Sequence, residues 1–535
     1  MSASPTPLPP PPGFHPGSRT RNLGRLKTET FDILIAGGGI NGAGIARDLA
    51  LRSHRTGLAL KIGLIDKRHF SGGTSGRNSQ LIHGGLRYLK YFEFDLVREA
   101  LAERRTLLQI APHLVEPLPM LLPFYSGYDR YFYGAGLWLY DQLAGEYNIG
   151  RRRYLRPDEV ASLEPGLARG GMHSAAIYFD ARVQSARLTL ENLFDASRLG
   201  AAIVNYADAG GWKKRDSDGL IQVPVTEQFT GEQFTIRTRR IVDARGPWED
   251  SGNVRLVRGS HIVMPALNRS ENAIAYFGDD GRIIFVIPWG PGHRLSLVGT
   301  TDIDHHGTAD RVRISNEEVR YLRGVVARLF PGQSAGSEPL AAYSSLRPLI
   351  VSGSASATAA SRSHKIWIED GVLKITGGKY TTYRSMSEEA VDLLLPETRG
   401  DCETADLAVG GNSPERFKRN LSQAPSLAAR YGREPAGLVA LTRLFGCQTP
   451  AMLEAGGVVA WAIQREMAMR LADVMFVSTY WGHEDHWTAE KLEPLAREMQ
   501  RRLGWTAERM REEIALTLDL ARMPGAVSSS EHEPA

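Results

Sequence analysis

Apolar residues first gather into a clear pattern at residue 31. Residues 31–36 (FDILIA) form a short apolar run that ends at three glycines, which predicts a buried strand entering a tight turn. The alanine-rich residues 40–51 predict a helix, and residues 58–66 predict a second strand that ends in an acid. Strand, helix and strand in this order form a βαβ unit, so the sequence predicts a parallel sheet in this part of the chain.

The middle of the chain changes to shorter strands and turns. Residues 233–242 predict a strand that leads into a Gly-Pro turn. Residues 282–289 and 295–302 predict neighbouring antiparallel strands, and residues 365–376 predict a hairpin followed by a helix.

The composition and the spacing of apolar residues change again after Pro396. Residues 415–521 are dominated by Ala, Leu, Arg and Glu in a helical pattern. We therefore expect an α/β fold class, with a Rossmann-type parallel sheet, an antiparallel-sheet substrate domain and an all-α C-terminal domain. The expected boundaries are a disordered proline-rich tail at 1–28, two interleaved oxidoreductase domains at 29–396, the helical domain at 410–523 and a disordered tail at 524–535.

Composition and charge narrow the class of protein. Among 535 residues, 64 Lys and Arg face 60 Asp and Glu, and a formal net charge of +4 is too small to suggest a nucleic-acid partner. Cys402 and Cys447 lack a Cys-x-x-Cys spacing, which argues for a reducing compartment and against a cysteine-based metal site. No run approaches the roughly 18 apolar residues of a transmembrane helix. We expect the chain to work inside a cell, in solution or on a membrane surface.

The glycines after the first strand form a dinucleotide-binding fingerprint. In Gly37-x-Gly39-x-x-Gly42, the first glycine permits the turn, the second lets a pyrophosphate approach, and the third lets helix and strand pack closely. Asp66 follows the second strand, where a carboxylate can accept hydrogen bonds from ribose hydroxyls. A structural glycine turn is the alternative, and the fingerprint alone does not separate FAD from NAD.

Several longer motifs follow this fingerprint in order. They are residues 73–89 (GTSGRNSQLIHGGLRYL), 258–263 (RGSHIV), 285–289 (FVIPW), 299–302 (GTTD), 344–349 (SSLRPL), Ser361-Arg362 and 377–384 (GGKYTTYR). Together they resemble the FAD-dependent glycerol-3-phosphate dehydrogenase family of the aerobic, quinone-linked type. The likeness runs from about residue 31 to 382 and continues in the helical tail at 427–432 and 461–475.

This resemblance implies an FAD-binding Rossmann-type domain and a phosphorylated substrate. Arginine suits a phosphate dianion because its planar fork donates two hydrogen bonds. The expected substrate-binding residues are Arg87, Tyr88, Arg347, Arg362 and Lys379. The expected FAD-binding residues are Gly37, Gly39, Asn41, Gly42, Asp66, Thr74, Ser75, His83, Gly84, Gly378 and Thr381, and no metal is expected.

The implied reaction is the oxidation of glycerol 3-phosphate to dihydroxyacetone phosphate. The C2 hydrogen passes as hydride to the flavin while the hydroxyl group loses a proton. His83, Arg347 and Lys379 are the catalytic candidates, and the sequence does not choose between them for handling the proton.

The family further implies transfer of electrons to a membrane quinone. The protein is then cytoplasmic and peripheral on the cytoplasmic face of the inner membrane, and a homodimer is among the expected assemblies. An oxidase that reduces O2 and a non-catalytic flavin-binding scaffold are the alternatives.

Two positions depart from the family pattern, and two segments invite other interpretations. Gln80 replaces a usual lysine, which removes a cation near the flavin or its phosphates, and Arg245 replaces a usual threonine, where it can contact or crowd the cofactor phosphates. Residues 302–306 (DIDHH) carry metal-ligand residue types, but a solvated turn is expected. Residues 125–156 suit either a membrane interface or a buried helix at 134–143 followed by a basic loop.

Overall fold

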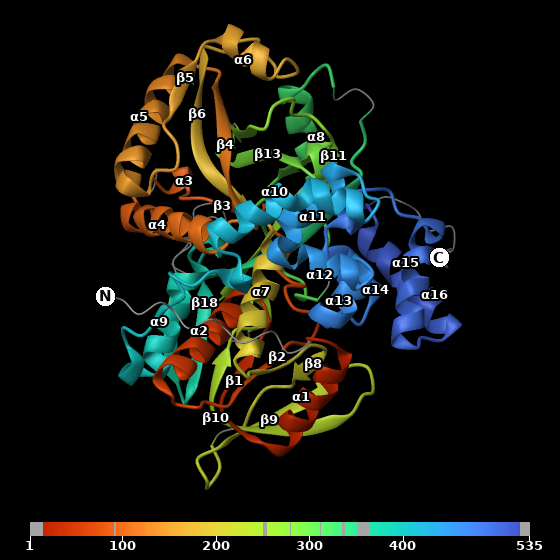
Figure 1. Cartoon of the computed structure of the whole chain (residues 1–535). Coiled ribbons are helices and arrows are strands. Elements are labelled where there is room, and N and C mark those ends of the chain that lie inside the picture. The colour runs from red at the N-terminus through yellow and green to blue at the C-terminus, as the bar shows by residue number, and fades with distance from the viewer. Residues whose placement is uncertain are drawn as a thin grey trace, which may run out of the picture.

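The computed structural model describes residues 14–89, 92–213, 215–249, 254–278, 280–310, 312–333, 337–350 and 364–524. Within these residues the chain forms two sheets and a group of C-terminal helices. Figure 1 shows the first sheet in the lower part of the molecule and the second in the upper part, with the C-terminal helices, in light to dark blue, extending from the middle of the view to its right side.

The first sheet is built around the predicted βαβ unit. Its central strands lie in the order β18, β10, β1, β2, β7, and all these neighbours are parallel. The carboxyl ends of these strands therefore meet at one edge, where α/β sheets bind ligands. The strands of this sheet are β1 (Thr30–Ala36), β2 (Ile62–Ile65), β7 (Ala202–Val204), β8 (Ala207–Ala209), β9 (Ile221–Glu227), β10 (Gln233–Asp243), β17 (His364–Glu369) and β18 (Val372–Gly377).

The second sheet is mainly antiparallel. The predicted neighbours β13 and β14 pair with each other, and β11 pairs with both β14 and β16. Its strands are β3 (Leu81–Ile82), β4 (Val115–Phe124), β5 (Arg153–Leu155), β6 (Ser174–Val183), β11 (Val254–Pro265), β12 (Ala273–Phe277), β13 (Ile283–Trp289), β14 (Leu295–Gly299), β15 (Ile303–Asp304) and β16 (Ala341–Ile350).

Helices of the same region cover the sheets. Helix α7 packs against α2, and all of its residues from 185 to 196 are buried. The helices are α2 (Ile40–Thr56), α3 (Leu86–Leu89), α4 (Phe94–Ile110), α5 (Gly127–Ala144), α6 (Pro157–Leu163), α7 (Ser185–Arg198), α8 (Asn316–Leu329) and α9 (Tyr383–Leu394).

The expectation of a disordered tail over residues 1–28 is wrong for its second half. Helix α1 (Pro16–Thr28) begins at a proline. The first N–H groups of a helix have no partner within the helix, so the N–H that proline lacks is not needed there. The His15 side chain accepts a hydrogen bond from the Ser18 amide and caps the helix. Buried Arg19 forms an ion pair of 2.6 Å with Glu227 and fixes the helix to the first sheet. Residues 1–13 lie outside the described residues.

The described elements after residue 413 are helical, as the sequence predicts. They are α10 (Pro414–Arg430), α11 (Pro435–Phe445), α12 (Thr449–Glu454), α13 (Val458–Glu466), α14 (Leu471–Asp473), α15 (Ala489–Leu503) and α16 (Ala507–Ala521). A buried ion pair between Arg187 of α7 and Glu466 of α13 joins them to the first sheet's helices. The expected fold class is confirmed.

Candidate active site

The glycine turn between β1 and α2 leaves no room for side chains. Gly37 has a φ of 111°, and a Cβ atom there would lie 2.4 Å from the Ala244 carbonyl oxygen. A Cβ atom on Gly42 would lie 1.9 Å from the Gly37 carbonyl oxygen. The turn therefore requires glycine at both positions.

The first turn of α2 is capped from another segment. The Ser75 Oγ accepts a hydrogen bond of 2.8 Å from the Ile40 amide, while Gly39 at the N-cap has no side chain to do so. A Cβ atom on Gly39 would lie 3.0 Å from this hydroxyl. The helix N-terminus, with its partial positive charge, thus faces a cavity with bare backbone.

Asp66 fastens the same turn. Its Oδ2 accepts a hydrogen bond of 2.7 Å from the Gly38 amide, and its Oδ1 accepts one of 2.7 Å from the Arg68 amide. Burial disfavours the charged form and raises the pKa of Asp66 to about 6 despite these two bonds. The carboxyl group lines the cavity, where it can meet ribose hydroxyls.

One cavity of about 460 Å³ joins the glycine turn to the substrate candidates. This volume lies within the range of roughly 300–1,000 Å³ for small-molecule sites. The sequence-predicted residues that line it are Gly37, Gly39, Asn41, Asp66, Thr74, Ser75, His83, Arg347, Gly378, Lys379 and Thr381.

Two of the expected cofactor residues do not line this cavity. Gly42 serves the packing of α2 on the turn, as described above. The Gly84 amide donates hydrogen bonds to the Tyr140 hydroxyl (2.9 Å) and to Asp180 (3.3 Å). Gly84 thus lies against α5 and β6, where a Cβ atom would collide with Tyr140.

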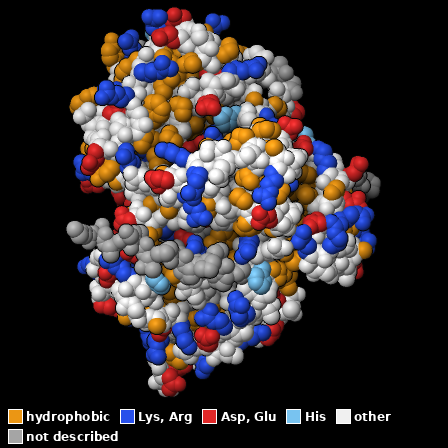
Figure 2. Space-filling view, in the orientation of Figure 1, with side chains coloured by type: hydrophobic (Ala, Val, Ile, Leu, Met, Phe, Trp, Pro, Cys, Tyr) orange, Lys and Arg blue, Asp and Glu red, His pale blue; other side chains and the backbone are white. Residues whose placement is uncertain are grey.

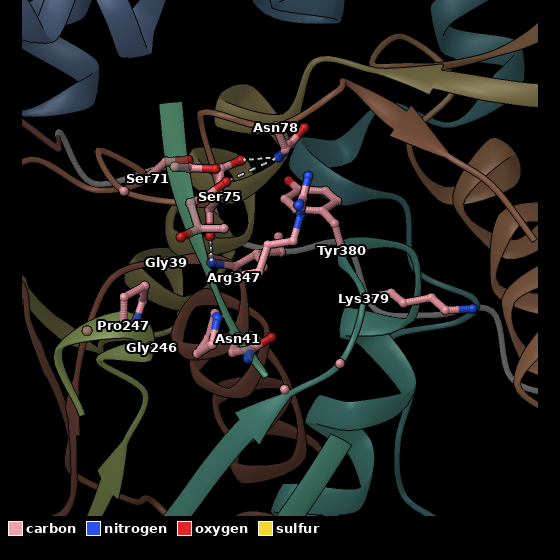
Figure 3. A pocket seen from close by; sticks show the side chains of 18 of the residues that line it. Gly39, Asn41, Ser71, Ser75, Asn78, Gly246, Pro247, Arg347, Lys379 and Tyr380 are labelled. Carbon is pink, nitrogen blue, oxygen red and sulfur yellow. Dashed lines mark hydrogen bonds between the residues drawn. The ribbon is translucent and has the colours of Figure 1, made fainter. Parts of the chain in front are cut away.

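Arg347 enters the cavity from β16 (Figure 3), and neighbouring oxygen atoms hold its guanidinium. Its guanidinium forms an ion pair with Asp302 and donates to the Thr301 carbonyl oxygen (3.2 Å) and to the Thr300 hydroxyl (2.8 Å). Asp302 is nearly buried, with 4% of its side chain exposed. The expectation of a solvated turn at residues 302–306 is therefore wrong at Asp302, because this carboxylate orients the arginine.

Asp304 and His305 in the segment 302–306 make contacts of their own. Asp304 forms an ion pair with Arg255 on β11, and His305 contacts the Thr308 carbonyl oxygen. Among the described residues, no three His, Cys, Asp or Glu side chains are grouped so that they could hold a metal ion.

His83 and Lys379 lie in the same cavity but differ in orientation. The His83 amide donates to the Thr381 hydroxyl (3.2 Å), and its ring packs 6.4 Å from the Phe285 ring between centroids. Figure 3 shows the Lys379 side chain extending away from Arg347, and its Nζ donates to the Leu96 carbonyl oxygen at 3.4 Å.

Three predicted substrate residues cannot be placed. The side chains of Arg87 and Tyr88 lie outside the described part of the structure, although their backbone forms α3. Arg362 also lies outside the described residues.

His261 is a cavity residue that was not among the expected site residues. Its Nε2 lies 2.8 Å from the Ser79 Oγ, and its ring stacks on Tyr343 at 5.0 Å. Burial and the nearby Arg347 charge lower the pKa of His261 to about 3, so the ring is neutral at physiological pH. His261 is the histidine of the RGSHIV motif at residues 258–263. This motif supported the family resemblance, but no role at the site was predicted for its histidine.

The two departures from the family pattern have structural explanations. Buried Gln80 faces away from the cavity, and its Oε1 accepts hydrogen bonds from the Ser185 amide (3.0 Å) and the Tyr480 hydroxyl (3.2 Å). Arg245 lines the cavity, but the Nε and Nη2 atoms of its guanidinium each donate a hydrogen bond of 2.8 Å to the Asp243 carboxylate. The guanidinium also lies over the Trp212 ring. Its charge is compensated within its own segment.

The bare turn, the acid after β2 and the continuous cavity suit a dinucleotide held by its pyrophosphate and ribose. A scan of family models matches residues 32–384 to FAD dependent oxidoreductases. The fold and this site define an FAD-dependent oxidoreductase.

Similar proteins specify the family further. A glycerol-3-phosphate dehydrogenase from Synechocystis sp. is 33% identical over 502 residues, which cover 85% of this chain and 89% of that protein. An aerobic glycerol-3-phosphate dehydrogenase from Staphylococcus aureus is 32% identical over 433 residues, 76% of each chain. This chain belongs to the FAD-dependent glycerol-3-phosphate dehydrogenase family.

Solved structures share the fold. The glycerol-3-phosphate dehydrogenase from Bacillus halodurans, complexed with FAD, has a TM-score of 0.77 at 24% identity and covers 96% of this chain and 100% of its own. The L-alpha-glycerophosphate oxidase from Mycoplasma pneumoniae, with FAD bound, has a TM-score of 0.53 at 19% identity and covers 69% of this chain and 95% of its own.

Proposed function

We propose that this enzyme oxidises sn-glycerol 3-phosphate to dihydroxyacetone phosphate and passes the electrons to a membrane quinone. The observation that carries the proposal is the single cavity that joins the pyrophosphate-binding turn to the oriented guanidinium of Arg347. The names of the curated relatives support the choice of substrate.

Arg347 is the main phosphate-binding candidate among the described side chains. Asp302, Thr301 and Thr300 fix the plane of its guanidinium before the substrate arrives, which lowers the entropic cost of binding. Arg87, Tyr88 and Arg362 remain predicted contributors to the same anion site.

We assign acceptance of the C2 hydroxyl proton to His83. An imidazole has an ordinary pKa near neutrality, and the backbone of His83 is fixed by Thr381 at the edge of the cavity. Lys379 is less suited in this conformation because its ammonium group donates to Leu96. FAD, when bound, would accept the hydride from C2.

The proposed location is the cytoplasmic face of the inner membrane, where a quinone is accessible. None of the helices in the described ranges is long and apolar enough to cross a membrane. The alternative of a buried helix at 134–143 holds for one face of α5, where Gly134, Leu137 and Tyr140 are buried, whereas Trp138 is 53% exposed. Earlier in α5, Tyr128 and Tyr131 are 71% and 78% exposed.

Figure 2 shows hydrophobic side chains with Lys and Arg among them in the upper part of the molecule, where Figure 1 places α5 and β5. Exposed aromatic rings on α5, together with exposed Arg151, Arg153 and Tyr154 in the segment that follows, suit the interface of an anionic membrane. A homodimer remains a prediction.

The choice of electron acceptor is tested with purified enzyme and glycerol 3-phosphate. We expect a soluble ubiquinone analogue to be reduced at a rate that accounts for the dihydroxyacetone phosphate formed, with little hydrogen peroxide in air. Peroxide formed in equal amount to product, with no faster turnover when the quinone is added, would instead identify an oxidase.

A further inference from the structure

A second cavity of about 790 Å³ lies between the oxidoreductase region and the C-terminal helices. Its walls include the loop at residues 72–77, β16 and residues 519–524. Residues 247–248, 309–314, Arg68, Arg258, Phe476 and His483 also contribute to the lining. Of the expected site residues whose side chains are described, Thr74 lines this cavity and the others do not.

The second cavity adjoins the cavity of the candidate active site. Both are lined by Arg68, residues 72–74, residues 247–248 and Ser345, and Gly73 lies against the Trp248 ring, where a Cβ atom would be 3.0 Å away. Arg77, Arg258 and His483 line only the second cavity.

Its charge is strongly positive. Among the described lining residues, five arginines face two aspartates, a formal excess of three positive charges. Arg68 pairs with Asp310 at 2.7 Å, and Arg313 pairs with Asp519. Arg77 has no side-chain hydrogen bond or ion pair with any described residue, although burial and the nearby Arg68 lower its pKa to about 10.

Other polar atoms at this cavity also lack partners within the described structure. His483 is 4% exposed, and its buried Nδ1 has no hydrogen-bond partner there. The buried Nε of Arg258 is likewise unpartnered, whereas its outer nitrogen pairs with Glu318 at 2.8 Å. Both atoms are sealed from solvent, so a ligand in the cavity would meet Arg77 rather than these two atoms.

Part of the remaining wall is apolar. Ile314, Leu346, Phe476, Leu520 and Met523 form this part, whose surface suits a hydrocarbon or aromatic body, while Thr74, Tyr343, Ser344 and Ser345 add polar groups. The volume far exceeds the space that one small inorganic anion needs.

We propose that the second cavity binds an organic anion whose carboxylate or phosphate group meets Arg77 and whose apolar body lies against Leu346 and Phe476.

The test uses the FAD-loaded enzyme and anilinonaphthalene sulfonate, an aromatic anion whose fluorescence rises in apolar sites. We expect Arg77→Gln to weaken its dissociation constant about tenfold or more, because charged hydrogen bonds are among the strongest in proteins. Arg511→Gln, which removes an exposed arginine of α16, is the matched control and should leave the constant within twofold.

Leu520→Asp provides a second variant that does not disturb the core, because Leu520 is 37% exposed at the cavity. It should also weaken binding by charge repulsion. Displacement of the probe by phenyl phosphate rather than benzoate assigns a phosphate monoester, and the reverse order assigns a carboxylate.

Equal probe affinity in the parent, Arg77→Gln and Leu520→Asp would overturn the proposal. Loss of flavin absorbance from purified Arg77→Gln would also overturn it, because the arginine would then belong to the cofactor site.

Discussion

Asp66 makes the cofactor site sensitive to pH. With its pKa raised to about 6, this carboxyl is ionised near pH 8 and protonated near pH 5. A proton on the Asp66 carboxyl removes an acceptor for the ribose hydroxyls. FAD binding must therefore release this proton. We expect the affinity of the apoprotein for FAD to fall as the pH decreases below about 6, approaching tenfold per pH unit.

Fluorescence titration of the apoprotein with FAD across this range measures the effect. Asp66→Asn should bind FAD more weakly at pH 8 and show a flat profile. A parent profile as flat as that of the variant would mean that Asp66 does not titrate at the cofactor.

Gly42 and Gly24 offer a matched pair of glycine-to-alanine substitutions in helices. In Gly42→Ala the new methyl group would lie 1.9 Å from the Gly37 carbonyl oxygen, so α2 must shift and FAD should be lost. In Gly24→Ala nothing lies within 4 Å of the new methyl group, and the substitution at this exposed position of α1 should stabilise the protein by about 0.5–1 kcal/mol. The flavin absorbance of the two purified proteins measures this difference. Equal flavin content in both variants would contradict the role of the glycine turn in binding FAD.

Arg347 should act on the substrate rather than on FAD. Arg347→Ala should lower kcat/KM for glycerol 3-phosphate by about tenfold to several hundredfold, given roughly 1.5–3 kcal/mol per charged hydrogen bond, with flavin content unchanged. Arg347→Lys should restore only part, because an ammonium group lacks the planar fork.

Arg255→Ala is the control, since Arg255 pairs with Asp304 and does not line the cavity. A fall in kcat with KM nearly unchanged would assign Arg347 to the developing C2 oxyanion. Values within twofold of the parent would exclude a strong substrate contact.

At the scale of elements, the C-terminal helical region supports the active site through Tyr480. Its hydroxyl accepts a hydrogen bond of 3.0 Å from the Ala186 amide at the start of α7 and contacts Gln80, which precedes β3. Tyr480→Phe leaves that buried amide without a partner and should lower the free energy of unfolding by about 1–3 kcal/mol.

Urea denaturation of the FAD-loaded protein measures this loss. Tyr431→Phe, whose hydroxyl forms one exposed hydrogen bond with Glu454, should change stability by less than about 0.5 kcal/mol. If the two variants were equally stable, Tyr480 would not hold α7.

The elements that the sequence predicted best are those encoded by local patterns. The βαβ unit, the β13–β14 pair and the hairpin of β17 and β18 follow from apolar runs bounded by glycines. Helix α1 was missed because proline content outweighed the fact that Pro16 stands at the first helical position. The direction of Gln80 depends on Tyr480, 400 residues away, and no local pattern records that contact.

At the scale of the whole molecule, the sequence predicted residues that line the cavity but not how its parts are held. His83, Arg347 and Lys379 were found through motifs and lie in one cavity. The pairing of Arg347 with Asp302 and the neutral His261 beside it arise only when β11, β14 and β16 lie together. The second cavity likewise requires the C-terminal helices to pack on β16.

The central claim is that the assembled molecule transfers a hydride from glycerol 3-phosphate to its own FAD. The most direct test mixes the purified FAD-loaded enzyme with sn-glycerol 3-phosphate in the absence of oxygen and any acceptor, with glycerol as the control. We predict that glycerol 3-phosphate bleaches the yellow flavin absorbance and forms one dihydroxyacetone phosphate per flavin, while glycerol does neither. Flavin that stays oxidised with glycerol 3-phosphate, yet is bleached by dithionite, would contradict the account.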